Sequence, residues 1–139
     1  MDVKSSMKSL TSYTPEDNLM FKGFIDAVRA EGEPWTGYFM TLLLTGQRRE
    51  AVAAMRWQDL DLNNGVWFLP SWDSKNGRSL SIALTSDAVK LLTKIRKMAI
   101  NEYVFSSTAS ASGRIVNPVK AFKRICDRAG VHDLRIHDL

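Results

Sequence analysis

The sequence is poor in the residues that bind metals or form disulfides. It has a single cysteine, Cys126, and two histidines, His132 and His137. One cysteine excludes an internal disulfide, and so few histidines and cysteines offer no cluster with the spacing of zinc ligands. We therefore expect neither a bound metal nor a cofactor.

Long hydrophobic segments and nucleotide-binding or hydrolase motifs are also missing. No apolar run approaches the roughly 18 residues of a transmembrane helix, and the N-terminus lacks the apolar core of a signal peptide. There is no Walker loop, Gly-x-Gly-x-x-Gly, His-Glu-x-x-His or Gly-x-Ser-x-Gly, so nucleotide-binding, zinc-protease and α/β-hydrolase functions lack their motifs. We expect a cytoplasmic protein that makes no membrane contact.

What is present is an ordinary globular composition with an uneven charge. The 139 residues are 45% hydrophobic and 24% charged, which is typical of one soluble domain. Residues 74–139 carry 12 lysines and arginines against 5 acidic residues, whereas residues 1–73 carry 7 against 10. The basic half is where a polyanion would bind.

Local signals predict helices on both sides of a small sheet. Apolar spacing and capping residues indicate helices near residues 15–31, 34–45, 48–55, 86–97 and 118–129. Runs of β-prone residues next to Asn-Gly turns indicate strands near residues 66–69 and 80–84. The predicted fold class is α+β, mostly helical, with a small antiparallel β-sheet of three strands or fewer in the middle. A flexible lead-in at residues 1–12 is expected to precede a single domain at residues 13–139.

Three residues are candidates for chemistry on an anion. Arg48 follows Thr-Gly-Gln at the break between two predicted helices, where it could clamp a phosphate or equally form a structural salt bridge to Glu50 or Asp59. Lys75, at the tip of the predicted hairpin, could reach over a phosphate and deliver a proton, or could be a solvated turn lysine. His137 could act as an acid or base, or could be a surface or capping histidine.

Several segments together resemble the phage-integrase or tyrosine-recombinase family. Residues 45–48 (Thr-Gly-Gln-Arg) with 55–61 resemble the box that holds the family's first arginine. Residues 75–78 (Lys-Asn-Gly-Arg) with 82–85 resemble its lysine hairpin and the following strand. Residues 103–105 (Tyr-Val-Phe) resemble the strand-like element after its basic helix, and residues 137–139 (His-Asp-Leu) the opening of its His-x-x-Arg box. The resemblance covers about residues 10–139, and the agreement in order and spacing is more specific than any one segment.

The resemblance implies a role for each candidate in DNA strand exchange. Arg48 would clamp the scissile phosphate, Lys75 would protonate the departing 5′ oxygen, and His137 would be the first acid/base or phosphate-binding residue of the second box. The family cleaves and rejoins DNA through a 3′-phosphotyrosyl intermediate without a metal. Positive side chains would then stabilise the charge that a metal ion stabilises in other phosphoryl-transfer enzymes.

Some family features have no counterpart in these residues. An acidic residue usually stands three positions after the first arginine, where this sequence has Ala51. The second-box arginine would follow Leu139, and the nucleophilic tyrosine lies further downstream in the family. We therefore expect a partial catalytic domain that is inactive alone.

The resemblance implies double-stranded DNA as the partner and an oligomer on DNA for the parent protein, in a bacterial or phage-host cytoplasm. Basic side chains of the hairpin and of two helices are the expected DNA contacts: Lys75, Arg78, Lys90, Lys94, Lys97 and Lys120. One alternative is a noncatalytic DNA-binding module or regulator that kept the fold. A helical protein-interaction adaptor, which would show no salt-sensitive DNA binding, is another.

Overall fold

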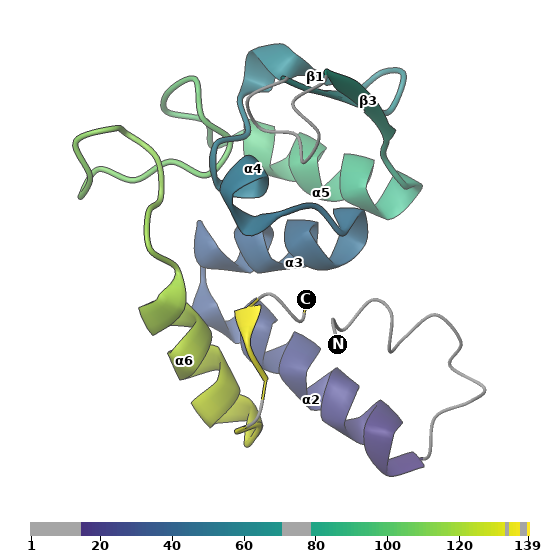
Figure 1. Ribbon diagram of the computed structural model, residues 1–139, viewed down its shortest axis with the longest axis vertical. Coiled ribbons are helices and arrows are strands. Elements are labelled where there is room, and N and C mark those ends of the chain that lie inside the picture. Colours follow the sequence, from purple (N-terminus) through teal and green to yellow (C-terminus); the bar gives the residue numbers. More distant parts are fainter. Residues whose placement is uncertain (1–14, 71–78, 133, 137–138) are drawn as a thin grey trace.

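The computed structural model describes residues 15–70, 79–132, 134–136 and 139 (Figure 1). In the described ranges, helices precede and follow a short sheet. The helices are α2 (Pro15–Glu31), α3 (Trp35–Thr45), α4 (Arg49–Ala53), the 3-10 turn η2 (Trp57–Asp59), α5 (Ser86–Arg96) and α6 (Val119–Ala129). The strands are β1 (Leu60–Asp61), β2 (Val66–Leu69) and β3 (Leu80–Ala83). The predicted helix–sheet–helix order is confirmed.

The helix ends lie where the capping residues predict them. The Thr85 side chain accepts a hydrogen bond from the Ala88 N–H at the start of α5. Gly46 ends α3 with φ 67°, and Gly130 ends α6 with φ 72°. Both backbones are left-handed, which glycine adopts without the steric penalty that a Cβ atom introduces. Local sequence alone therefore fixes these boundaries.

The sheet is antiparallel with the strand order β1-β2-β3. Leu69 of β2 pairs with Leu80 of β3, so the two strands approach each other on both sides of the predicted hairpin tip. The tip itself, with Lys75 and Arg78, lies outside the described residues. Leu60 pairs with Trp67 in the two-residue strand β1, which is not among the strands predicted from the sequence. Two residues are too few to show the alternation that identifies a strand.

Helix α3 lies at the centre of the molecule. It packs against α2, α4 and α5, and Figure 1 shows it between the sheet with α5 on one side and α2 with α6 on the other. Tyr38 and Phe39 of this helix are fully buried, and so is Phe105, whose ring meets that of Tyr38 edge-on with centroids 5.8 Å apart. All three aromatic residues belong to the hydrophobic core.

Helices α2 and α6 are held together by a shared carboxylate. The side chain of Glu31 is 6% exposed, and its Oε2 accepts hydrogen bonds from Nε and Nη2 of Arg124 at 3.0 and 2.7 Å. Arg128 contacts the other carboxylate oxygen at 3.4 Å and donates to the Ala27 carbonyl at 2.9 Å. Planar guanidinium groups suit this forked contact. It fixes α6 along the C-terminal half of α2.

No helix within the described ranges has both the length and the apolar character needed to cross a membrane.

Candidate functional site

The Thr-Gly-Gln-Arg segment forms the turn between α3 and α4. Gly46 donates its N–H to the Leu42 carbonyl at 2.9 Å, and its left-handed backbone turns the chain away from α3. The Thr45 hydroxyl accepts from the Gln47 N–H at 3.3 Å, which holds the next residue of the turn. Arg48 then has an extended backbone (φ −66°, ψ 145°) immediately before α4. The hydrogen bonds and backbone conformations of this turn thus place Arg48 at the surface, immediately before α4.

Arg48 is exposed and forms no ion pair with any residue in the described part of the chain. Glu50 pairs instead with Arg49, at 3.4 Å between Oε1 and Nε. Asp59 pairs with Arg56 at 3.5 Å. The structural alternative for Arg48, a salt bridge to Glu50 or Asp59, is therefore wrong. Both carboxylates are engaged by arginines closer to them in the fold.

Arg48 lines a pocket of about 390 Å³ together with the end of the chain. Ile136 and Leu139 also line this pocket and are both 8% exposed. These two residues flank His137, which lies outside the described residues, as does Lys75. The fold thus brings Ile136 and Leu139, which stand on either side of His137 in the sequence, to the pocket that Arg48 lines about 90 residues earlier in the chain.

Ala51 occupies the position where the resemblance described above implies an acidic residue. It lies in α4, is 1% exposed and belongs to the hydrophobic core. The neighbouring Glu50 is exposed, with its side chain 71% accessible. A carboxylate at position 51 would be buried, whereas the methyl group of alanine packs in the hydrophobic core.

Both described tyrosines make contacts within the fold. Tyr38 is fully buried, its hydroxyl donates to the Arg49 carbonyl at 3.2 Å, and burial raises its pKa well above the usual 10. Tyr103 is partly buried in an extended segment that bridges to Arg56. Tyr13 lies outside the described residues.

The expected DNA-binding lysines lie on two helices. Lys90 and Lys94 are exposed on α5, Lys97 is exposed immediately after it, and Lys120 is exposed at the start of α6. Lys94 lines a pocket with Glu33, whose carboxylate it faces and stabilises electrostatically. Its charge is thus partly balanced within the protein. Arg78 lies, like Lys75, outside the described residues.

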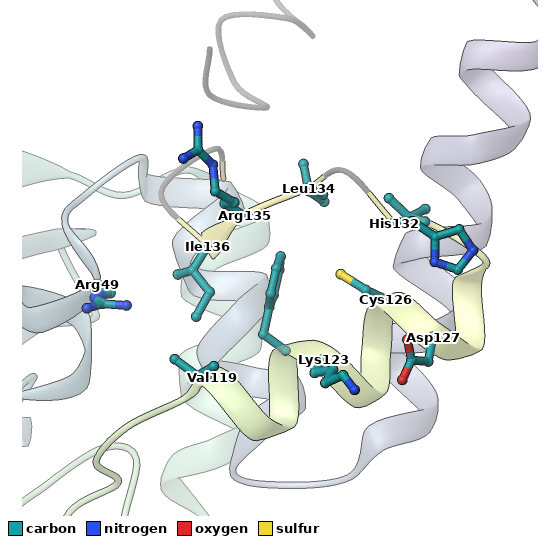
Figure 2. Close-up of a pocket in the computed structure, with 11 residues that line it drawn as sticks. Arg49, Val119, Lys123, Cys126, Asp127, His132, Leu134, Arg135 and Ile136 are labelled. Atoms are coloured by element: carbon teal, nitrogen blue, oxygen red, sulfur yellow. The ribbon is translucent and has the colours of Figure 1, made fainter.

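A second pocket, of about 760 Å³, contains cations that the sequence motifs did not single out (Figure 2). It lies between α6 and residues 131–136, and its lining includes Arg49, Lys123 and Arg135. Arg49 also lines the pocket of Arg48, so it lies between the two. The spacing of basic residues along α6 was the available signal for Lys123, but the residues that line the pocket with it depend on the tertiary fold.

The chain contains a second His-Asp-Leu triplet, which begins at His132 and is followed by Arg135. This pair also has the His-x-x-Arg spacing. His132 is exposed, and Figure 2 shows it at the end of α6 with Arg49 across the pocket. The pocket of Arg48 is lined by the neighbours of His137 and not by His132. His132 therefore lines a different pocket from Arg48.

Among the described residues, no group of three His, Cys, Asp or Glu side chains is arranged to hold a metal ion. Cys126 is buried, and burial raises the pKa of its thiol.

Comparison with known proteins gives a consistent result. The model of the phage integrase family matches residues 22–139. Prophage integrase IntF of Escherichia coli K12 is 32% identical in an alignment over 124 residues, and the match covers 85% of this chain and 26% of that protein. A shufflon-specific DNA recombinase of Escherichia coli is also 32% identical, over 73% of this chain and 24% of its own length. The integrase of Salmonella phage P22 is 26% identical over 77% of this chain and 30% of its length.

Solved structures agree on the fold. The crystal structure of XerA recombinase matches 91% of this chain and 46% of its own, with a TM-score of 0.62 and 17% sequence identity. The chain spans about a quarter to a third of the curated relatives that it matches. Since the family model extends over most of the sequence, the chain belongs to the phage integrase family.

Proposed function

We propose that this chain forms part of the catalytic domain of a site-specific DNA recombinase, which cleaves and rejoins strands through a 3′-phosphotyrosyl intermediate. The observation that carries the proposal is the pocket of Arg48. An exposed arginine without an ion-pair partner among the described residues lines this pocket together with Ile136 and Leu139, the neighbours of His137. An unpaired arginine is suited to bind a phosphate in a forked contact.

The proposed chemistry assigns one task to each residue. Arg48 stabilises the negative charge that develops on the nonbridging oxygens of the scissile phosphate. Lys75 donates a proton to the departing 5′ oxygen, and His137 binds the phosphate or moves a proton beside it. Preorganised positive charge of this kind contributes most where charge develops in the transition state.

Duplex DNA is the proposed partner, and the cytoplasm of a bacterium or phage host the proposed location. The basic second half supplies the long-range attraction. The exposed lysines of α5 and α6 supply further contacts with phosphates, which position the duplex without reading its sequence. We expect the chain alone to be a monomer or a weak oligomer, and assembly to occur on DNA. Sedimentation with and without a duplex measures this.

Salt-dependent DNA binding tests the site. We expect Arg48→Ala to weaken duplex binding and to lower the slope of log K against log salt by about 0.9, the value for one lost phosphate contact. Lys22→Ala is the matched control, because Lys22 is an exposed cation of α2 and is not one of the expected DNA contacts. Identical slopes for Arg48→Ala and the wild type would remove Arg48 from the proposed site. Binding that is insensitive to salt would favour a protein-interaction adaptor.

Covalent trapping tests the chemistry. The tyrosines of the chain are Tyr13, Tyr38 and Tyr103, and we expect none of them to form an adduct with a nicked duplex. In a protein that joins this chain to a downstream catalytic tyrosine, Arg48→Ala and Lys75→Ala should each slow adduct formation by about 100-fold or more. A tyrosine-linked adduct of the 139 residues alone, or wild-type rates in both variants, would refute these assignments.

A further inference from the structure

Tyr38 connects the core of the protein to the turn that carries Arg48. It lies in α3, ten positions before Arg48, and none of its surface is exposed. Its hydroxyl crosses to the next helix and donates a hydrogen bond to the Arg49 carbonyl at 3.2 Å. The bonded residue is the first of α4 and the immediate neighbour of Arg48.

The ring of Tyr38 is held from several sides. Trp35, Phe39 and Phe105 each meet it in an edge-on arrangement, with ring centroids 5.0–6.0 Å apart. Aromatic pairs prefer this geometry, which limits the rotation of the side chain. The position of the hydroxyl is therefore set by the packing of the core.

Helix α4 depends on such an anchor. It has five residues, far fewer than an isolated helix needs to form in water. Its first helical hydrogen bond runs from the Val52 N–H to the Arg48 carbonyl, at 3.1 Å. The side chains of Ala51, Val52 and Ala53 are buried, and the hydrogen bond from the Tyr38 hydroxyl fixes the first turn. The direction in which the Arg48 side chain leaves the backbone follows from that turn.

The chemistry of the hydroxyl suits a permanent donor. Burial and the nearby charge of Glu50 raise the pKa of Tyr38 above its usual value, while Arg49 and Arg114 oppose the shift. The neutral phenol therefore persists through the physiological range and keeps its proton for the carbonyl.

We propose that Tyr38 is a positioning residue, which orients Arg48 toward the DNA phosphate by fixing the first turn of α4. This inference rests on the proposed function, because it requires that Arg48 contact DNA. Tyr38 does not touch the phosphate itself and acts through the Arg49 carbonyl.

A double-mutant cycle tests the inference. Duplex affinity is measured by fluorescence anisotropy for the wild type, Tyr38→Phe, Arg48→Ala and the double variant, with Tyr103→Phe as the matched control. We expect Tyr38→Phe to weaken binding about 2- to 10-fold, the range that corresponds to one lost hydrogen bond. In the Arg48→Ala background the same change should have almost no effect, because the two residues act as one unit. Tyr103→Phe should leave affinity unchanged.

Hydrogen exchange of the Val52 amide is the second measurement. We expect Tyr38→Phe to accelerate exchange in α4 while α2 and α5 stay protected. Global loss of protection, equal effects of Tyr38→Phe in both backgrounds, or unchanged affinity would each overturn the positioning role. If Arg48→Ala itself leaves binding unchanged, the proposed function fails instead, so the two failures are distinguishable.

Discussion

Gly37 and Gly23 are both glycines within helices, and they differ in their surroundings. A Cβ atom on Gly37 would lie 2.6 Å from Cδ1 of Ile95, 2.8 Å from Oε2 of Glu33 and 3.2 Å from the Phe105 ring. No described atom lies within 4 Å of a Cβ atom on Gly23. Replacing each glycine by alanine should therefore change stability in opposite directions.

The magnitudes follow from two opposing effects. Alanine in a helix interior is favoured over glycine by about 0.5–1 kcal/mol, because glycine loses more backbone conformational freedom on folding than alanine does. Overpacking a well-filled core costs about 1–3 kcal/mol. Ile95 and Glu33 present the flexible ends of their side chains, whereas the Phe105 ring is held by Tyr38. We expect Gly37→Ala to lower the free energy of unfolding by about 1 kcal/mol and Gly23→Ala to raise it by about 0.5–1 kcal/mol.

Urea denaturation followed by circular dichroism measures both changes in the same chain. The two variants share the same chemical substitution and a helical backbone, so their difference isolates the contacts at Gly37. If Gly37→Ala stabilises the chain as much as Gly23→Ala does, the close approach of α3 to α5 is refuted.

Three further predictions concern two carboxylates and the thiol. Glu31→Gln removes the charge shared by the two arginines of α6 and should lower the free energy of unfolding in urea by about 1–2 kcal/mol, with Asp26→Asn as the unchanged control. Burial raises the pKa of Glu33 above 4.5 despite the opposing charge of Lys94, so the folded state binds this proton more tightly. The stability of the wild type relative to Glu33→Gln should fall as pH rises through that raised pKa, and a rise would contradict it. Iodoacetamide should alkylate buried Cys126 at least about tenfold more slowly in the folded chain than in urea, and equal rates would contradict its protection.

The parts of the fold that follow from local chemistry could be predicted from the sequence. The left-handed caps Gly46 and Gly130 and the side-chain cap Thr85 each act within a few residues, so their effect can be read along the chain. The strand β1 could not be predicted, because it consists of two residues that become a strand only by pairing with β2. Tertiary contact, not propensity, defines that element.

The candidate site divides in the same way. The turn around Arg48 has a local motif, and its exposure follows from the order of residues in that turn. The contact of Tyr38 with Arg49 joins two helices, and that of Glu31 with Arg124 spans 93 residues. Lys94 was predicted from a basic helical face, but its partial neutralisation by Glu33 depends on the packing of α5 against α3. Pairings between helices have no signal in one sequence.

These long-range contacts make the stability of α3 and the geometry of Arg48 interdependent. Phe105 would lie 3.2 Å from a new Cβ atom at position 37, and the same ring meets Tyr38 edge-on. A side chain at position 37 therefore displaces the ring that holds Tyr38, and through its hydroxyl the first turn of α4. Gly37→Ala should weaken duplex binding in the wild type by more than its effect in the Arg48→Ala background. Gly23→Ala, where a new Cβ atom has no described atom within 4 Å, should leave binding unchanged in both backgrounds.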